Sequence, residues 1–144
     1  MVSHLAPEAQ THFVTGTSAP CTSIFKPVWL GAELPDMGPA PTGTYDAAAL
    51  FWRHEVLHRA TLRDYASRIA LYQDERDELE RCFSAGALTR ADRTAYTAQC
   101  FAEADEATGR WIERVRPADL LTHQSLLHSL AWRDFNRSAN MPPL

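Results

Sequence analysis

The first thirty residues have the hydrophobic pattern of β-strands rather than of a helix. β-Branched and aromatic residues cluster at 11–15 and again at 22–25, as is typical of strands. Ser18, Ala19 and Pro20 between the two clusters are turn-forming or turn-compatible residues. We therefore predict two short strands, which need further strands or a covering helix because a lone two-stranded ribbon is marginally stable in water.

A segment rich in proline and glycine follows, from residue 31 to residue 45. Its three prolines and three glycines suit neither a helix nor a central strand. We predict a connecting loop, which is long for a compact domain.

After the loop, apolar residues recur at alternating steps of three and four, the period of an amphipathic helix. The stretch 46–84 contains no proline or glycine, Asp46 suits the N-cap, and Gly86 suits a left-handed cap at the end. The pattern predicts one long helix. Its apolar seam comprises Leu62, Tyr65, Ile69, Tyr72, Leu79 and Phe83.

Two more helices are expected after this one. Residues 89–92 have the form of a capping box and open a pattern that ends before Pro117, so a short loop joins an antiparallel hairpin. Pro117 suits the first turn of a third helix, with an apolar face at Leu120, Leu127, Leu130 and Ala131. Small residues on one side of the second helix permit close packing; they are Ala91, Ala95, Ala98, Ala102 and Gly109.

These patterns predict an α+β, mostly helical fold. A length of 144 residues is that of one ordinary domain. We expect a single domain with strands in 1–30, the loop in 31–45 and helices in 46–144.

Composition narrows the function classes. With 45% apolar and 22% charged residues the chain should bury a core. A net charge of −4 without a basic stripe argues against nucleic acid as a partner. The longest apolar run, 47–52, is far too short to span a membrane and the start lacks a leader pattern, so we expect a cytoplasmic protein.

Three cysteines, Cys21, Cys82 and Cys100, lack CxxC spacing, which argues against a disulfide framework and against a cysteine-built zinc site. We expect Cys82 and Cys100 to be small core residues. Cys21 could pair with His12 or His4 as a nucleophile. Spacing assigns it no base, and we favour packing at a turn or in the core.

The segment His54-Glu55-Val56-Leu57-His58 matches the HExxH pattern of zinc metalloproteases. On a helix its two histidines lie one turn apart and Glu55 could activate a bound water. Glu78 could be proposed as the third zinc ligand, but along a continuous helix it would lie about 30 Å from His58. A zinc site therefore needs a break near Thr61, or a third ligand such as His123 or His128.

We favour a structural interpretation of this segment. In it, Trp52, Arg53, His54, Glu55 and His58 form a polar and aromatic cluster that anchors the helix against the strands. No metal and no cofactor is then expected, and zinc catalysis stays the less favoured alternative.

Two stretches together resemble one known family. Residues 11–28 (THFVTGTSAPCTSIFKPV) and 50–59 (LFWRHEVLHR) resemble segments in the carboxy-terminal portion of secernins and dipeptidase A-type peptidases. Their order and the proline-rich spacer between them also fit. The resemblance covers about the first sixty residues, and the helical remainder only in character.

The resemblance implies an N-terminal-nucleophile cysteine hydrolase with a four-layer αββα fold, whose catalytic cysteine is the first residue of the mature chain. Here the chain starts at Met1 and no cysteine precedes Cys21, so no catalytic residue carries over. It also implies that the HExxH match is a packing feature, and that Thr15, Ser23 and Lys26 line the cleft of a complete enzyme.

The expected function is therefore the carboxy-terminal segment of a secernin-like dipeptidase or amide hydrolase that is not catalytic by itself. Its expected partner is a separate amino-terminal hydrolase segment or a second copy, because unpaired strand edges at 2–5 and 12–17 would recruit other strands. The alternatives are a non-catalytic helical interaction module and, less favoured, the zinc metallopeptidase.

Overall fold

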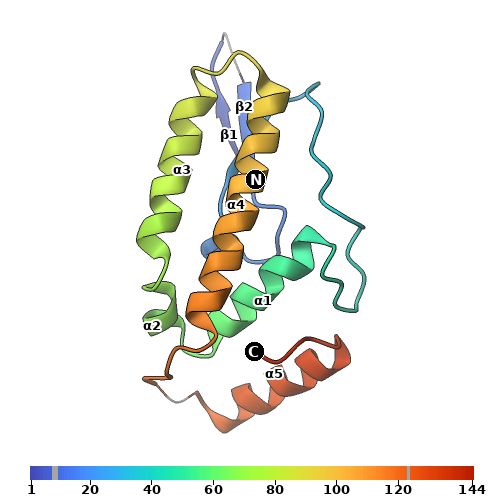
Figure 1. Cartoon of the computed structure of the whole chain (residues 1–144), viewed down its shortest axis with the longest axis vertical. Coiled ribbons are helices and arrows are strands. Elements are labelled where there is room, and N and C mark those ends of the chain that lie inside the picture. Colours follow the sequence, from blue (N-terminus) through green and yellow to red (C-terminus); the bar gives the residue numbers. More distant parts are fainter. Residues whose placement is uncertain (8–9, 123) are drawn as a thin grey trace.

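The chain folds into an α+β structure in which a small antiparallel sheet adjoins a set of helices (Figure 1). This computed structural model describes residues 1–7, 10–122 and 124–144. The elements in chain order are β1 (Val2–Leu5), β2 (Gln10–Val14), the 3₁₀ turn η1 (Pro20–Thr22), β3 (Lys26–Val28), α1 (Leu50–Leu62), α2 (Tyr65–Ile69), α3 (Gln73–Ala87), α4 (Arg93–Val115) and α5 (Leu126–Ser138).

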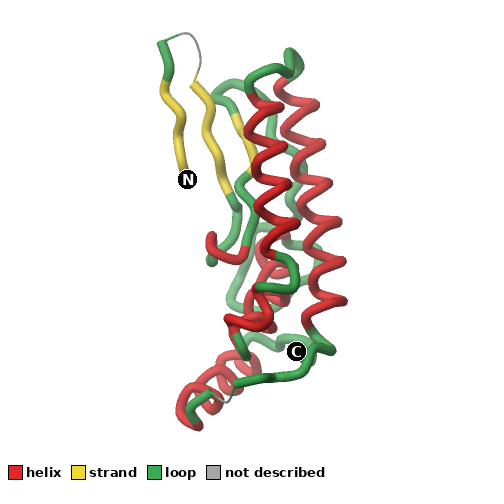
Figure 2. The backbone as a smooth tube through the Cα atoms, turned by 90° about the vertical axis from the view of Figure 1, so that its left-hand side faces the viewer, coloured by secondary structure: helices red, strands yellow, loops and turns green. Residues whose placement is uncertain are grey.

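The sheet has the order β1-β2-β3 and both pairings are antiparallel. In Figure 2 β3 lies nearest the helices and β1 farthest from them. Every residue of β1 is exposed, and β2 is its one strand neighbour in the described part of the chain. Pro27 of β3 lies opposite Phe13 of β2. Because β3 is an edge strand, the missing N–H of Pro27 is tolerated there.

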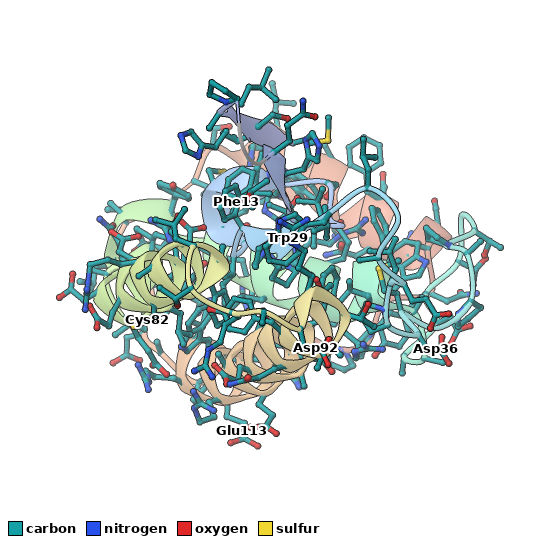
Figure 3. All side chains as sticks on the ribbon, turned by 90° about the horizontal axis from the view of Figure 1, so that it is seen from above. Phe13, Trp29, Asp36, Cys82, Asp92 and Glu113 are labelled. Atoms are coloured by element: carbon teal, nitrogen blue, oxygen red, sulfur yellow. The ribbon has the colours of Figure 1, made fainter. Side chains whose placement is uncertain are left out.

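The core fills the space between β3, the α3–α4 hairpin and α1. Phe13 and Trp29 lie where the strands meet the hairpin (Figure 3), and the Tyr72 and Trp111 rings stack with centroids 4.8 Å apart. Such offset aromatic pairs add stability beyond their buried area. The core's buried members on α3 and α4 are Phe83, Ala87, Tyr96, Cys100, Ala104, Ala107, Trp111 and Val115.

The prediction of one helix over 46–84 is wrong, because three helices occupy this stretch. The first break follows Leu62, where Asp64 leaves the helical path with φ −157° and ψ 81°. Its buried carboxylate accepts hydrogen bonds from the backbone amides of Leu121 (2.7 Å) and Thr122 (2.9 Å). The break thus serves a contact with a segment that is 57 residues away in sequence.

Arg68 compensates for the same break. Its guanidinium donates to the carbonyl of Ala60 at 2.6 Å, near the carboxyl end of α1, and to the carbonyl of Ala118 at 2.7 Å. Carbonyls in the last turn of a helix lack intrahelical partners. A side chain from the next helix therefore satisfies one of them without glycine or proline.

Two predicted boundaries in the first half also need correction. The strand predicted at 22–25 corresponds to β3, which begins only at Lys26, because Pro20–Thr22 forms the 3₁₀ turn. Helix α1 begins at Leu50 rather than after Asp46. Asp46 instead accepts a hydrogen bond from the amide of Ala48 at 2.9 Å, which makes a local turn.

The expected caps of the hairpin are wrong as well. Gly86 lies inside α3, and the N-cap of α4 is Asp92, whose carboxylate accepts from the amide of Ala95 at 2.9 Å. Glycine suits position 86 for a different reason. A Cβ there would lie 1.9 Å from the hydroxyl oxygen of Tyr96, which donates to the Phe83 carbonyl at 3.2 Å.

The stripe of small residues on α4 does not face its partner helix. Ala91, Ala95, Ala98, Ala102 and Gly109 are all exposed. The opposite side carries the larger apolar side chains of α4 and is buried, because burying them removes more apolar area from water. Cys82 is likewise exposed and Cys100 buried, so the core expectation for the cysteines in helices holds for one of the two.

The third helix starts at Leu126 rather than at Pro117, with Ser125 as its N-cap. It buries no residue, and Leu127 of the predicted apolar face is 80% exposed. The tail after it is not detached, because the amide of Tyr45 donates to the carbonyl of the buried Ala139 at 2.7 Å. No helix in the described ranges has the length and apolar content to cross a membrane.

Candidate functional site

The polar residues of α1 meet the turn that connects β2 to β3. The hydroxyl oxygen of Thr22 lies 3.5 Å from Nε2 of His54 and 3.4 Å from Nδ1 of His58. The two imidazole rings are nearly parallel, with centroids 6.4 Å apart. Thr22 also donates to the carbonyl of Ala19 at 3.2 Å. One buried threonine thus joins both histidines to the 3₁₀ turn.

Glu55 is buried with its charge paired. Its carboxylate accepts hydrogen bonds from the Ser18 hydroxyl and, at 2.9 Å, from Nε of Arg59. The Arg59 guanidinium lies 5.5 Å from the ring centroids of both Trp52 and Trp132. Pairing and hydrogen bonding offset the cost of burying these charges. This cluster connects α1 to the β2–β3 turn and to α5.

The remaining members of the predicted cluster point toward other neighbours. Arg53 forms an ion pair with Asp105 of α4, at 2.8 Å, and donates to the carbonyl of Ala48 at 2.7 Å. Trp52 is buried and packs edge-on against Tyr45. Successive residues at the start of α1 therefore contact the loop before α1, α4 and the turn after β2.

Burial determines the protonation of the two histidines. It lowers the pKa of His54 to about 4, since an imidazolium without solvent is disfavoured, and it lowers the pKa of His58 as well. Both rings are therefore neutral at pH 7. A neutral imidazole is the form that binds metals, so protonation alone does not oppose the zinc alternative.

The arrangement of groups around the two histidines does not resemble a zinc site. Nε2 of His54 and Nδ1 of His58 both face the hydroxyl oxygen of Thr22, which occupies the place where a shared metal would lie. The Glu55 carboxylate accepts hydrogen bonds from Ser18 and Arg59. Across residues 1–7, 10–122 and 124–144, no three His, Cys, Asp or Glu side chains form a group that could hold a metal.

The break required for a zinc site does occur after Leu62, but among the described residues it brings no third ligand to His54 and His58. Glu78 pairs with Arg81 on the exposed side of α3. His128 bonds to Gln124 and accepts from Trp132, and His123 lies outside the described residues.

Lys26, the chain's only lysine, is 2% exposed. Its ammonium donates to the carbonyls of Thr15 and Ile24, both at 2.8 Å, and lies 5.0 Å from the ring centroid of Phe101. No ion pair to Lys26 occurs among the described residues. Burial lowers its pKa to about 8, so the charged form is held in place by carbonyl dipoles and an aromatic face.

Thr15, Ser23 and Lys26 are all buried. Ser23 and Lys26 line a small, partly open space of about 10 Å³ together with His54, the volume of about one water molecule. The described chain therefore presents these residues in its interior rather than on an open surface. Their expected place beside the cleft of a complete enzyme stays a prediction.

The thiols lack the features of an activated nucleophile. Burial raises the pKa of Cys100 to about 11, and a hydrogen bond to Glu78 raises the pKa of Cys82. Cys21 is exposed at the 3₁₀ turn. His12, its proposed partner, has its Nδ1 2.9 Å from the Ser3 hydroxyl, and no described histidine bonds to the Cys21 thiol.

Sequence reasoning missed a third set of residues. Trp132, Arg133, Asn136 and Arg137 follow one side of α5 and line a groove of about 870 Å³ together with Arg63 from the end of α1. These four residues recur at steps of one and three, which places them on one side of a helix, and this spacing is the signal that the sequence offers for the groove. The facing wall comes from parts of the chain that only the fold brings close.

Comparison of the chain with family models, with curated proteins and with solved structures found no match.

Proposed function

We propose that this chain supplies the carboxy-terminal scaffold of a secernin-like, dipeptidase A-type hydrolase and hydrolyses no peptide bond by itself. One observation carries the proposal: the two stretches that resemble this family, 11–28 and 50–59, contact each other. Thr22 lies within 3.5 Å of both His54 and His58, and Ser18 donates to Glu55. The family-like residues are therefore partners in one buried network.

The chemistry of this network supports a scaffold role. Its carboxylate is neutralised by Arg59, and its imidazole at His54 has a pKa of about 4 and faces a hydroxyl. A general base works best with a pKa near the working pH. These buried groups join the β2–β3 turn to α1, which is a positioning role.

The sheet supports the same proposal. A three-stranded sheet with helices on one side and an unoccupied β1 edge in the described chain is compatible with a part of a larger αββα arrangement. Exposed edges are the parts of sheets that recruit further strands. In this proposal the β1 edge and the exposed residues of β1 contact the portion of the hydrolase that carries the nucleophile.

A hydrolysis assay tests the catalytic half of the proposal. The purified chain is incubated with a panel of dipeptides, and released amino acids are quantified by chromatography. We expect no turnover above buffer, and none with added zinc. Turnover that disappears in Cys21→Ser would contradict the proposal in favour of a thiol enzyme, and turnover that disappears in His54→Ala would favour the zinc alternative.

A helical interaction module is the second candidate, because α5 exposes apolar side chains. Leu126 and Leu127 are 74% and 80% exposed, and Phe135 is 59% exposed. Large exposed apolar patches commonly mark interaction sites. Replacing both leucines by serine should then abolish capture of a partner without altering the far-UV circular dichroism spectrum, whereas capture through β1 should survive this change.

A further inference from the structure

The groove beside α5 is a concave surface that the proposed function leaves unused. Its α5 wall presents Trp132, Arg133 and Arg137, and its facing wall includes Arg63 and Leu120. In Figure 1 α5 lies apart from the α3–α4 hairpin, with the carboxyl end of the chain between them. The volume of the groove, about 870 Å³, lies within the range of roughly 300–1,000 Å³ that is typical of ligand sites.

The charge of the groove is opposite to that of the chain. The chain has a formal net charge of −4, yet the residues that line the groove include three arginines and no aspartate or glutamate. Arg133 forms no ion pair within the described residues, and the one ion pair of Arg137 is a loose contact with Asp134 at 3.7 Å. Both guanidinium groups are therefore open to an external anion.

Arg63 also lines the groove. It donates at 2.5 Å to a main-chain oxygen of Leu144, the last residue of the sequence, so it is already engaged within the groove, and Arg133 and Arg137 are the guanidinium groups left for an external anion. Guanidinium groups favour carboxylates and phosphates through paired, planar hydrogen bonds.

The rest of the lining is apolar or neutral. The Trp132 ring and Leu120 supply apolar surface, and the tail contributes Met141 and two prolines. A purely polar anion would leave this surface uncovered. A ligand that combines carboxylates with apolar side chains covers both parts.

The spacing of the arginines suits a peptide backbone. Arg133 and Arg137 are one helical turn apart, which places their Cβ atoms about 5–6 Å from each other. Alternate side chains of an extended peptide are spaced by roughly 7 Å. Two acidic residues separated by one residue can thus face the two arginines together.

From these observations we propose that the groove binds an acidic segment of a partner protein in extended form, with its carboxylates at Arg133 and Arg137 and an apolar side chain against Trp132. This inference does not depend on the proposed hydrolase role. It explains why an acidic chain keeps exposed arginines without close ion pairs beside aromatic and aliphatic surface.

Fluorescence anisotropy tests the proposal with the full chain and a labelled peptide of sequence Gly-Glu-Leu-Glu-Leu-Glu-Gly. We expect saturable binding at about 20 mM salt that weakens at about 200 mM, because screening shortens the reach of exposed charges. The same peptide with lysine in place of glutamate should not bind. Absence of saturable binding of the glutamate peptide up to roughly 1 mM, which is the edge of weak specific binding, would overturn the proposal.

Charge-reversal variants locate the site. The double change Arg133→Glu and Arg137→Glu should weaken binding at least about tenfold, as expected for losing two exposed charge pairs and adding repulsion. The matched control, Arg81→Glu with Arg90→Glu, alters net charge equally on α3 and the hairpin turn and should leave binding unchanged. Equal weakening by both pairs would show attraction to the overall charge only and would refute the groove as the site.

Discussion

The buried ammonium of Lys26 should make the stability of this protein depend on pH in an unusual direction. Its pKa is about 8 in the folded chain, against 10.5 for an exposed lysine. Between these two values the unfolded chain holds a proton that the folded chain has released. The free energy of unfolding therefore rises with pH in this window.

The size of the effect follows from the pKa difference. Each pKa unit corresponds to about 1.4 kcal/mol, so the shift of Lys26 gives roughly 3 kcal/mol in total. Below pH 8 both states are protonated and the full cost of burying the charge is present. As pH rises to 10.5 the cost disappears, and most of the change should be seen by pH 10.

The change Lys26→Met isolates this contribution. Methionine fills a similar volume and cannot be charged, although it leaves the carbonyls of Thr15 and Ile24 without their donor. That loss is independent of pH. Tyr72 and Tyr96 have raised pKa values and titrate alike in both proteins. The charge of Lys26 lowers the pKa of Cys100, so both proteins carry Cys100→Ala and only the difference between them is interpreted.

Urea unfolding followed by tryptophan fluorescence, at pH 7, 8, 9 and 10, measures this difference. We expect the protein that keeps Lys26 to gain roughly 2 to 3 kcal/mol relative to Lys26→Met across this range. Because Lys26 is the only lysine, a carbon-13 label on lysine gives one side-chain signal whose titration reports its pKa directly. A constant difference between the two proteins, together with a signal that titrates near 10.5, would refute the buried ammonium.

Three further predictions concern the site and the hairpin. Burial lowers the pKa of His54 to about 4, so acidification from pH 6.5 to 4 should lower the unfolding free energy by roughly 3 kcal/mol. The variant His54→Gln should lack this loss in urea titrations. Equal acid sensitivity of the two proteins would count against a neutral buried ring. Glu55→Ala should lower the unfolding free energy by about 3 kcal/mol because it removes the carboxylate that neutralises the largely buried Arg59 guanidinium, which keeps only the neutral Asn136 oxygen, and a loss under about 1 kcal/mol would show that this pair is solvated. Gly86→Ala should destabilise by about 1–3 kcal/mol through its clash with Tyr96, whereas Gly109→Ala in the open middle of α4 should stabilise by up to about 1 kcal/mol; thermal melts with the same sign for both would refute this packing.

Local patterns predicted the types of element well. The strand at 10–14, the proline-rich connection and an antiparallel helical hairpin all follow from periodicity and turn residues. The α+β class follows from them. These features are visible in the sequence because each depends on residues that are close together along the chain.

The breaks and faces of the helices could not be predicted because they depend on distant residues. Asp64 ends α1 by accepting hydrogen bonds from backbone amides more than fifty residues further on. The buried side of α4 was predicted wrongly because small residues at 91–109 form a regular stripe. The larger apolar residues on the opposite side are the ones that pack in the core. Gly86 resembled a cap, yet its role is to admit the Tyr96 hydroxyl.

The candidate site was predicted in part. The sequence marks 50–59 as unusual, but it does not reveal that Thr22 joins both histidines or that Ser18 reaches Glu55. Contacts across 32 to 37 residues require the fold. The arginine-lined groove was missed for the same reason, since Arg63 and Arg137 are far apart in sequence and share the groove only after folding.

The most direct test of the proposed hydrolase scaffold is to determine the coding sequence immediately upstream of Met1 in the natural source. The proposal predicts a segment in the same orientation that encodes a cysteine-led hydrolase portion, either in frame or separated by one frameshift. An unrelated upstream sequence, together with sedimentation of the purified chain as a stable monomer, would contradict it.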